Sequence, residues 1–218
     1  GAELWLQNAI LPAGEGLTLT GTGWGGGTGG GGGALRSDTG ADQVLGPVTL
    51  AGNTTIFTNS ALTLAGKVTG GGNLVKAGAD VLTLSNSTND YTGTTTVSTG
   101  TLSVNADNAL GSTTGGTVVT SGATLQFNGA FDYTAAEPIF ITGTGVGGVG
   151  AINKVNGNGT LAAPITLVSN STIGSGTAGN KLTLNGAIAM PFVSDISFTG
   201  VGDIDVTQAF GNGNIPAA

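Results

Sequence analysis

The sequence predicts an all-β protein, and more specifically a coil of stacked parallel strands, a β-helix or β-solenoid. Two observations predict the strands: apolar residues alternate with Thr, Ser and Asn over short stretches, and Gly bounds most of these stretches. A third observation predicts the stacking, because 107 of the 218 residues are Gly, Thr, Asn or Ser and only 8% are charged. Uncharged polar side chains can repeat from coil to coil without repulsion.

The alternating segments follow one another about ten residues apart in much of the chain. Breakers such as the Gly-rich segment 70–73 and the Asn-Gly segment 156–159 interrupt any stretch that could extend into a long helix. The clearest predicted strands are 17–20, 48–50, 62–64, 81–84, 101–104, 165–167 and 182–184.

Strands this close in sequence suit antiparallel hairpins or a coil of parallel strands, since a βαβ crossover needs more residues. Hairpins would favour two-residue Asn-Gly or Asp-Gly turns and charged edge strands. A parallel β-helix stacks each coil on the last, so that Thr and Asn can form ladders along its length. The composition favours the parallel β-helix.

A sequence of about 120 residues occurs nearly twice. Segment 47–50 (PVTL) recurs as 164–167 (PITL), displaced by 117 positions, and 17–23 recurs as 139–145, displaced by 122. The insertions that change the displacement fall in Gly-rich turns. We therefore expect a single β-helix over residues 1–218, with a first unit at 1–122 and a partial second unit at 123–218.

Composition argues against several classes of function. Cys and His are absent, which removes disulfides, thiolate or His metal sites and His-dependent nucleophiles. The net charge is −7 and no segment concentrates the 5 basic residues, so we expect no nucleic-acid partner. No apolar run would span a membrane, and the first residues lack a signal-peptide pattern. We expect a mature or excised segment without cofactor or metal, whose 39% apolar residues form a core.

The most specific motif reads NLVKAGADVLTL over 73–84 and NDYTGTTTVSTGTL over 89–102. It closely resembles the passenger-associated β-strand repeat of bacterial autotransporters and of giant surface proteins, although Asp80 and Asn86 replace glycines of the pattern. The resemblance implies a right-handed parallel β-helix that is extracellular at a bacterial cell surface, and it implies no particular activity. The matching positions are Lys76, Gly78, Leu82, Leu84, Asn89, Tyr91, Gly93, Thr95, Val97, Gly100 and Leu102.

The second unit keeps some positions of this motif and changes others. Leu82 and Leu84 remain apolar at a displacement of 122, which predicts that they face inwards. The positions that change are predicted to face outwards, and they are Lys76 to Phe198, Val81 to Asp203 and Thr83 to Asp205.

Two Gly-rich segments, 21–26 and 143–148, formally satisfy the dinucleotide-binding pattern GxGxxG. Such a site needs a helix directly after the glycines, and nothing helical follows either segment, so we interpret both as β-helix turns. The tract 25–33 lacks the Lys-Ser/Thr of a phosphate loop. We interpret it as a flexible loop or, alternatively, as a close packing surface between subunits.

Asp203 and Asp205 lie two apart on a predicted strand and share one face, where they could hold Ca²⁺ or act as a carboxylate pair. The nearest Lys in sequence is Lys181. We favour a solvated pair that discourages edge aggregation. Aromatic residues are few, and we expect core or end-cap packing rather than sugar stacking for Trp5, Trp24, Tyr91 and Tyr133.

These observations predict a non-enzymatic, exported structural β-helix that assembles end to end into an extracellular fibre or forms part of a long surface passenger. The ends of a solenoid expose unpaired strands and apolar stacks. Two alternatives stay open: a glycan- or host-binding adhesin, and a polysaccharide-degrading β-helix enzyme. We expect self-association, head to tail or with neighbouring repeats, through Leu4, Trp5, Leu6 and Ile215.

Overall fold

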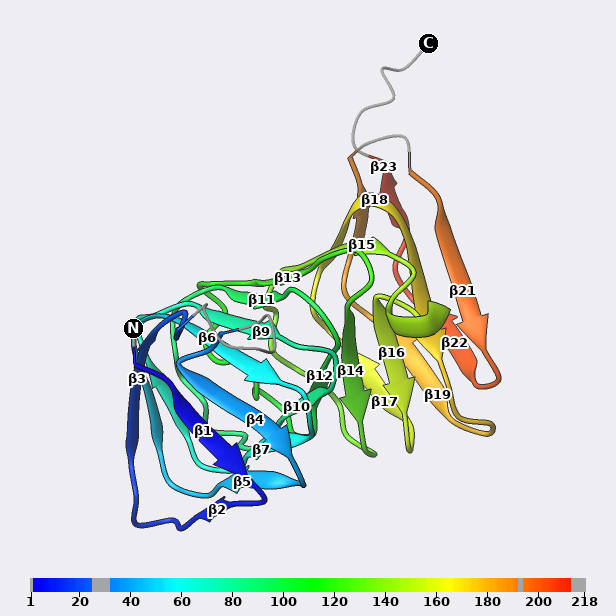
Figure 1. Ribbon diagram of the computed structural model, residues 1–218. Helices are drawn as coiled ribbons and strands as arrows, with labels where there is room; N and C mark the ends of the chain where they lie inside the picture. The colour runs from blue at the N-terminus through cyan, green and yellow to red at the C-terminus, as the bar shows by residue number, and fades with distance from the viewer. Residues whose placement is uncertain (1, 25–31, 192–193, 213–218) are drawn as a thin grey trace.

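A computed structural model describes residues 2–24, 32–191 and 194–212 of the chain. It is a parallel β-solenoid of about eight turns, which confirms the predicted fold class. Figure 1 shows the strands advancing in chain order from the N-terminal to the C-terminal end, so each coil stacks on the one before it. The described residues contain no α-helix and a single 3-10 turn, η1 (Val146–Gly148).

Each coil turns through three faces, and the strands on one face form a column of parallel neighbours. The first column holds β1 (Leu4–Gln7), β4 (Leu35–Thr39), the second half of β6 (Val48–Thr58), β9 (Leu74–Ala77), β11 (Thr95–Val97), β13 (Thr117–Val119), β15 (Ile139–Gly143), the first half of β18 (Ile165–Ser175), β20 (Ile188–Met190) and β23 (Phe210–Asn212). The second column holds β2 (Ile10–Leu11), β5 (Asp42–Val44), β7 (Leu62–Leu64), β10 (Val81–Leu84), β12 (Thr101–Val104), β14 (Thr124–Asn128), β16 (Ile152–Val155), the second half of β18 and β21 (Ile196–Gly200).

The third column begins with β3 (Leu17–Gly21), the first half of β6 and β8 (Val68–Gly70). It ends with β17 (Gly159–Leu161), β19 (Lys181–Leu184) and β22 (Asp203–Val206). Between these two sets, residues 89–92, 109–112 and Tyr133 carry the backbone hydrogen bonds from coil to coil without an assigned strand. The third face is therefore the least regular one in the middle of the rod.

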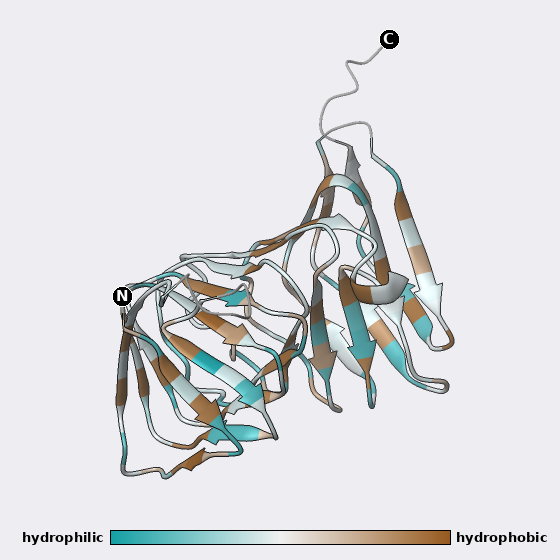
Figure 2. Ribbon diagram, viewed as in Figure 1, coloured by the Kyte–Doolittle hydropathy of each residue, from teal (hydrophilic) through white to brown (hydrophobic). Residues whose placement is uncertain are grey.

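The core consists of the inward side chains of all three columns, stacked in register. In the second column Leu62, Leu82, Leu102, Leu125 and Ile152 succeed one another and are at most 1% exposed. Burying one such side chain stabilises a fold by roughly 1.5 to 3 kcal/mol. The strands alternate between hydrophobic and hydrophilic residues in Figure 2, as expected when one side faces the core and the other the solvent.

Thr and Asn connect the coils in different ways. Thr18, Thr49 and Thr69 stand in register on the outside of the third column and form a ladder. Asn side chains reach across a corner to the backbone instead: the Asn73 Oδ1 accepts a hydrogen bond from the Thr94 N–H at 2.8 Å. A coil takes 21 or 22 residues in this part of the chain, because Leu74 pairs with Thr95 and Thr95 pairs with Thr117.

The two copies of the internal repeat lie on different faces of the rod. Val48 pairs within the third column, with β3 and β8, whereas the equivalent Ile165 pairs within the first column, with β15 and β20. A side-chain contact follows the same correspondence, since the Thr54 hydroxyl donates to the Leu19 carbonyl at 3.1 Å and the Ser171 hydroxyl to the Ile141 carbonyl at 3.2 Å. The second unit is thus displaced by one face around the axis.

In this correspondence β1 to β10 match, in order, β14, the Tyr133 segment and β15 to β22. The strands β11, β12 and β13 are the last strands of the first unit and have no counterpart among the described residues of the second, and we call them the connecting coil.

The described glycines of both Gly-rich segments bring two parts of the backbone close together at a corner. A Cβ on Gly23 (φ 70°) would lie 2.2 Å from the Gly33 carbonyl oxygen, and one on Gly145 (φ 77°) would lie 2.0 Å from that of Gly150. Only glycine allows this approach. No α-helix follows either loop in the described part of the chain, which agrees with the interpretation as turns. Within the tract 25–33, residues 25–31 lie outside the described residues.

Candidate functional site

The residues of the passenger-type motif meet where β9 and β10 contact the connecting coil. Val97 stands in register with Lys76, and Leu102 with Leu82. All of these positions are buried except the half-buried Gly93. The buried ones are Lys76, Gly78, Leu82, Leu84, Asn89, Tyr91, Thr95, Val97, Gly100 and Leu102.

Lys76 lies inside the rod, at 0% exposure, so the prediction that it faces outwards is wrong. It occupies an inward row between Ile56 and Val97, and its aligned residue Phe198 likewise continues the inward row of Ile173. The long aliphatic stem lies in the core while the ammonium reaches the corner. Val81 and Thr83 do lie on the outward side of β10 and are half-buried.

The Lys76 ammonium joins two coils. It donates hydrogen bonds to the carbonyls of Ala77 at 3.0 Å and Gly78 at 2.8 Å in its own coil, and to that of Thr99 at 2.9 Å in the next. Burial lowers the pKa of Lys76 to about 8, and the nearby Asp80 carboxylate partly opposes this. The Lys76 ammonium therefore links two successive coils at a corner and is shielded from solvent.

Gly78 and Gly100 form that corner in successive coils. Their φ angles are +85° and +67°, and a Cβ on them would lie 2.3 Å from the Thr58 oxygen and 2.4 Å from the Gly78 oxygen, respectively. The motif glycines are thus fixed by close stacking of backbone on backbone.

Asn89 supplies the coil contacts on the third face, where strands are not assigned. Its Oδ1 accepts from the Val68 N–H and its Nδ2 donates to the Ala109 carbonyl, both at 2.7 Å. One side chain thereby connects three coils.

Tyr91 and Tyr133 are 0% and 1% exposed, which confirms their predicted place in the core. The Tyr91 hydroxyl bonds to the Thr95 hydroxyl at 2.7 Å, and the Tyr133 hydroxyl donates to Glu137 at 3.1 Å. The Thr117 hydroxyl donates to the other Glu137 oxygen at 2.6 Å. Burial raises the pKa of Glu137 to about 7, although these two hydrogen bonds oppose the shift.

Glu137 was not predicted from the sequence as a site residue. Its one signal was the spacing, since Tyr133 and Glu137 are four residues apart, as are Tyr91 and Thr95. A carboxyl group at that position of a core motif can serve as the hydrogen-bond partner of the tyrosine.

Trp5 and Trp24 are 48% and 59% exposed, so of the predicted core or end-cap packing, the core position is wrong for both. Trp5 lies on the outward side of β1, in register with Arg36, whose guanidinium stands 4.8 Å from the Trp5 ring and 5.2 Å from that of Phe57. This cation–π stack covers the side of the first coils rather than their end.

The predicted association residues are divided between an end and a side of the rod. Leu4 is 37% exposed and borders a hollow of about 440 Å³ at the first coil, together with Leu17 and Leu19. Leu6 is nearly buried at 4%, and Ile215 lies outside the described residues. Of the four, Leu4 alone is placed to meet a partner at the N-terminal end within the described part of the chain.

Asp203 and Asp205 share the outward side of β22, as predicted, and β19 brings Lys181 to them. The Lys181 ammonium lies 2.7 Å from Asp205, both side chains are about half exposed, and the carboxylate raises the pKa of Lys181. This arrangement is a solvated ion pair. Among the described residues no group of three or more His, Cys, Asp or Glu could hold a metal ion, and no helix is long and apolar enough to cross a membrane.

The fold and the buried motif together define a repeat-containing β-solenoid. The family model described as passenger-associated-transport-repeat matches residues 74–104, the segment from β9 to β12. This match confirms the resemblance to autotransporter passengers and implies a secreted or surface-exposed protein. No curated protein and no solved structure matches the chain.

Proposed function

We propose that this chain is a non-enzymatic structural segment of a surface passenger, in which the solenoid serves as a rigid spacer outside the cell. The observation that carries the proposal is how the motif residues are used. Lys76, Asn89 and Tyr91 are all buried, and their polar atoms bond to partners inside the rod, those of Lys76 and Asn89 to neighbouring coils. Such residues specify a continuous stack rather than an exposed site.

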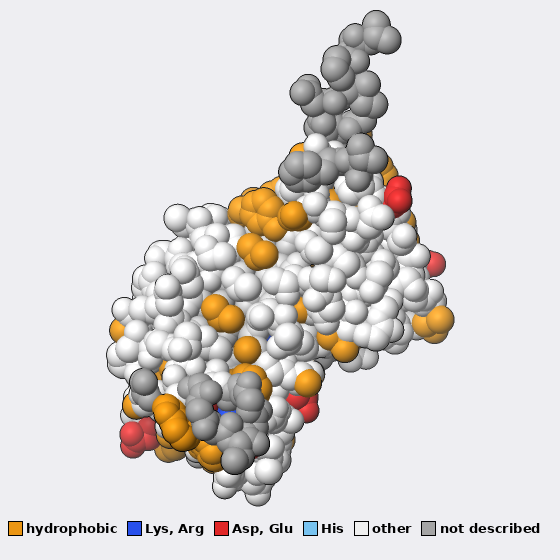
Figure 3. Space-filling view, turned by 45° about the horizontal axis from the view of Figure 1, so that its top comes forward, with side chains coloured by type: hydrophobic (Ala, Val, Ile, Leu, Met, Phe, Trp, Pro, Cys, Tyr) orange, Lys and Arg blue, Asp and Glu red, His pale blue; other side chains and the backbone are white. Residues whose placement is uncertain are grey.

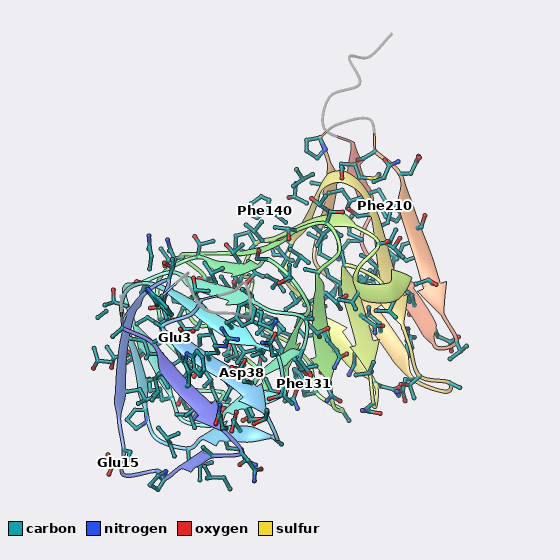
Figure 4. All side chains as sticks on the ribbon, viewed as in Figure 1. Glu3, Glu15, Asp38, Phe131, Phe140 and Phe210 are labelled. Carbon is teal, nitrogen blue, oxygen red and sulfur yellow. The ribbon has the colours of Figure 1, made fainter. Side chains whose placement is uncertain are left out.

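A segment of a long passenger is favoured over a fibre of separate copies. Glu15 is exposed on the first coil and Asp203 on the last one, beside the Lys181–Asp205 ion pair, so direct contact between copies would bring the Glu15 and Asp203 charges towards each other. Figure 4 labels Glu15 and Phe210 at opposite ends of the rod. Figure 3 shows charged side chains as isolated spots on an otherwise uncharged face.

A glycan-binding adhesin is the second candidate, and the exposed Trp5 and Trp24 favour it, because an exposed indole can stack on a sugar ring. A glycan array with the full chain and with Trp24→Ala tests this function. Binding that disappears in the variant would make the chain an adhesin.

The spacer function is tested by displaying the full chain on bacteria, fused to a translocator, with an epitope tag at its N-terminus. We expect antibody labelling of intact cells and a protease-resistant core after digestion from outside. A chain that folds in vitro yet stays inside the cell would contradict the proposal. So would release of reducing sugar from acidic or neutral glycans that Asp203→Asn abolishes.

A further inference from the structure

The last coil presents an apolar face at the C-terminal end of the rod. Phe198, Ile204 and Val206 continue inward rows and border a hollow of about 290 Å³. Phe198 is 45% exposed, and Ile204 and Val206 are half-buried. Within the described residues, β21 and β22 pair on one side, with β18 and β19 respectively.

The equivalent face of the first unit is completely covered. Lys76, Leu82 and Leu84 occupy the positions of Phe198, Ile204 and Val206, and each is 0% exposed. Their cover is the connecting coil, since β11 pairs with β9 and β12 with β10. Inward side chains of that coil, among them Val97 and Leu102, lie in register with the covered residues.

The same connecting coil supports the second unit from the other side. The strand β14, which corresponds to β1, pairs with β12, and β15, which corresponds to β3, pairs with β13. In these two columns, the strands that correspond between the two units therefore do not pair with each other directly, because the connecting coil lies between them.

We propose that the face of Phe198, Ile204 and Val206 binds a further parallel coil of the β11–β12 type, rather than the first coil of a second copy. The connecting coil is the cover that this chain already uses on the equivalent face. Aliphatic residues at the positions of Val97 and Leu102 would fill the hollow. The outward positions beside Asp203 and Asp205 correspond to Thr101 and Ser103, which bring no like charge.

The inference rests on the solenoid and is independent of export, so it is tested on the purified full chain. A copy of residues 94–116 is appended after Ala218, and amide hydrogen exchange is followed in β21 and β22. We expect the exchange of the Ile204 and Val206 amides to slow by about tenfold or more, with a rise in the urea midpoint. The control appends the same residues in scrambled order and leaves both unchanged.

A second variant carries Val97→Asp and Leu102→Asp within the appended copy, which keeps the chain itself intact, and it should lose the protection. Two results would overturn the proposal. One is equal protection by the intended and the scrambled extensions. The other is protection of β21 and β22 in the unextended chain that grows with protein concentration, which would identify a second copy as the occupant.

Discussion

Lys76 and Lys154 are buried lysines, at 0% and 1% exposure, in a protein with few charges. Desolvation lowers the pKa of both. Each ammonium donates to backbone carbonyls of its own coil and of a neighbouring coil, Lys154 to Val155 and Gly129. The charge is tolerated because the corner carbonyls replace the solvent.

Replacing Lys76 by Met should lower the free energy of unfolding by about 1 to 3 kcal/mol, because three carbonyls in a buried corner lose a charged donor. The hydroxyl donors that remain on the Ala77 and Gly78 carbonyls are long, at 3.4 Å and 3.3 Å. Urea unfolding at neutral pH measures the effect. The control is Lys67→Met, which removes an exposed ion pair with Asp90 and should change stability by under about 1 kcal/mol. Equal losses of unfolding free energy in the two variants would contradict the role of Lys76 in linking the coils.

Glu137 should make the rod less stable as the pH rises. Its pKa is raised from 4.5 to about 7, so the folded chain keeps the proton at pH values where the unfolded chain releases it. The protonated Glu137 contributes on the order of 3 kcal/mol to the free energy of unfolding. This contribution is fully present below about pH 4.5 and is lost as the pH rises to about 7.

Urea unfolding at several pH values, with Glu137→Gln, checks this expectation. The Glu137→Gln variant should lose the slope between pH 4.5 and 7, since an amide does not titrate there. The exposed Glu15→Gln should keep the slope. A pH profile of Glu137→Gln that runs parallel to that of the unsubstituted chain would disprove the assignment.

Asn89 replaces strand pairing on the third face at the middle of the rod. In Asn89→Ala the Val68 N–H and the Ala109 carbonyl lose their partner. We expect a loss of about 1 to 3 kcal/mol and faster hydrogen exchange of the Val68 amide. The exposed Asn105→Ala is the control, and an unchanged Val68 exchange rate in Asn89→Ala would refute the bridging role.

The sequence located most strands that alternate clearly, such as 62–64 and 81–84, because inward Leu and outward Thr mark them. It ended the strand at Leu50, whereas β6 continues to Thr58. Gly52 and Asn53 are typical of a break, yet the chain bends round the corner without leaving its neighbours, and the Thr54 hydroxyl bonds back to the Gly52 carbonyl at 2.9 Å. The propensities of Gly52 and Asn53 carry no information on the neighbouring coils that keep this segment in the sheet.

The same limit applies to the site. Leu82 and Leu84 were predictable as core from alternation, whereas the inward direction of Lys76 was not, because its burial depends on carbonyls 1, 2 and 23 residues away in sequence. Charge alone predicts exposure. Lys76 is an exception because its ammonium reaches the carbonyls of two stacked coils at a corner.

At the scale of the whole molecule, the sequence revealed the repeat but not its rotation. The displacement of 117 to 122 residues becomes informative only when it is compared with a coil of 21 or 22 residues, because it exceeds five coils by a part of one. The length of a coil depends on the corner loops, and these differ in length along the chain: Leu4 pairs with Leu35, but Thr54 with Leu74.

The displacement by one face makes the chain a screw. A lateral feature present once in each unit, such as the outward side of β3 and that of its equivalent β15, points in a new direction with each unit. If further units keep the same step, three of them would present that feature all the way round the axis, and the fourth would face the same way as the first. A long rod of this kind would have no front or back, and whatever approaches it from one side would find the feature at regular intervals along its length.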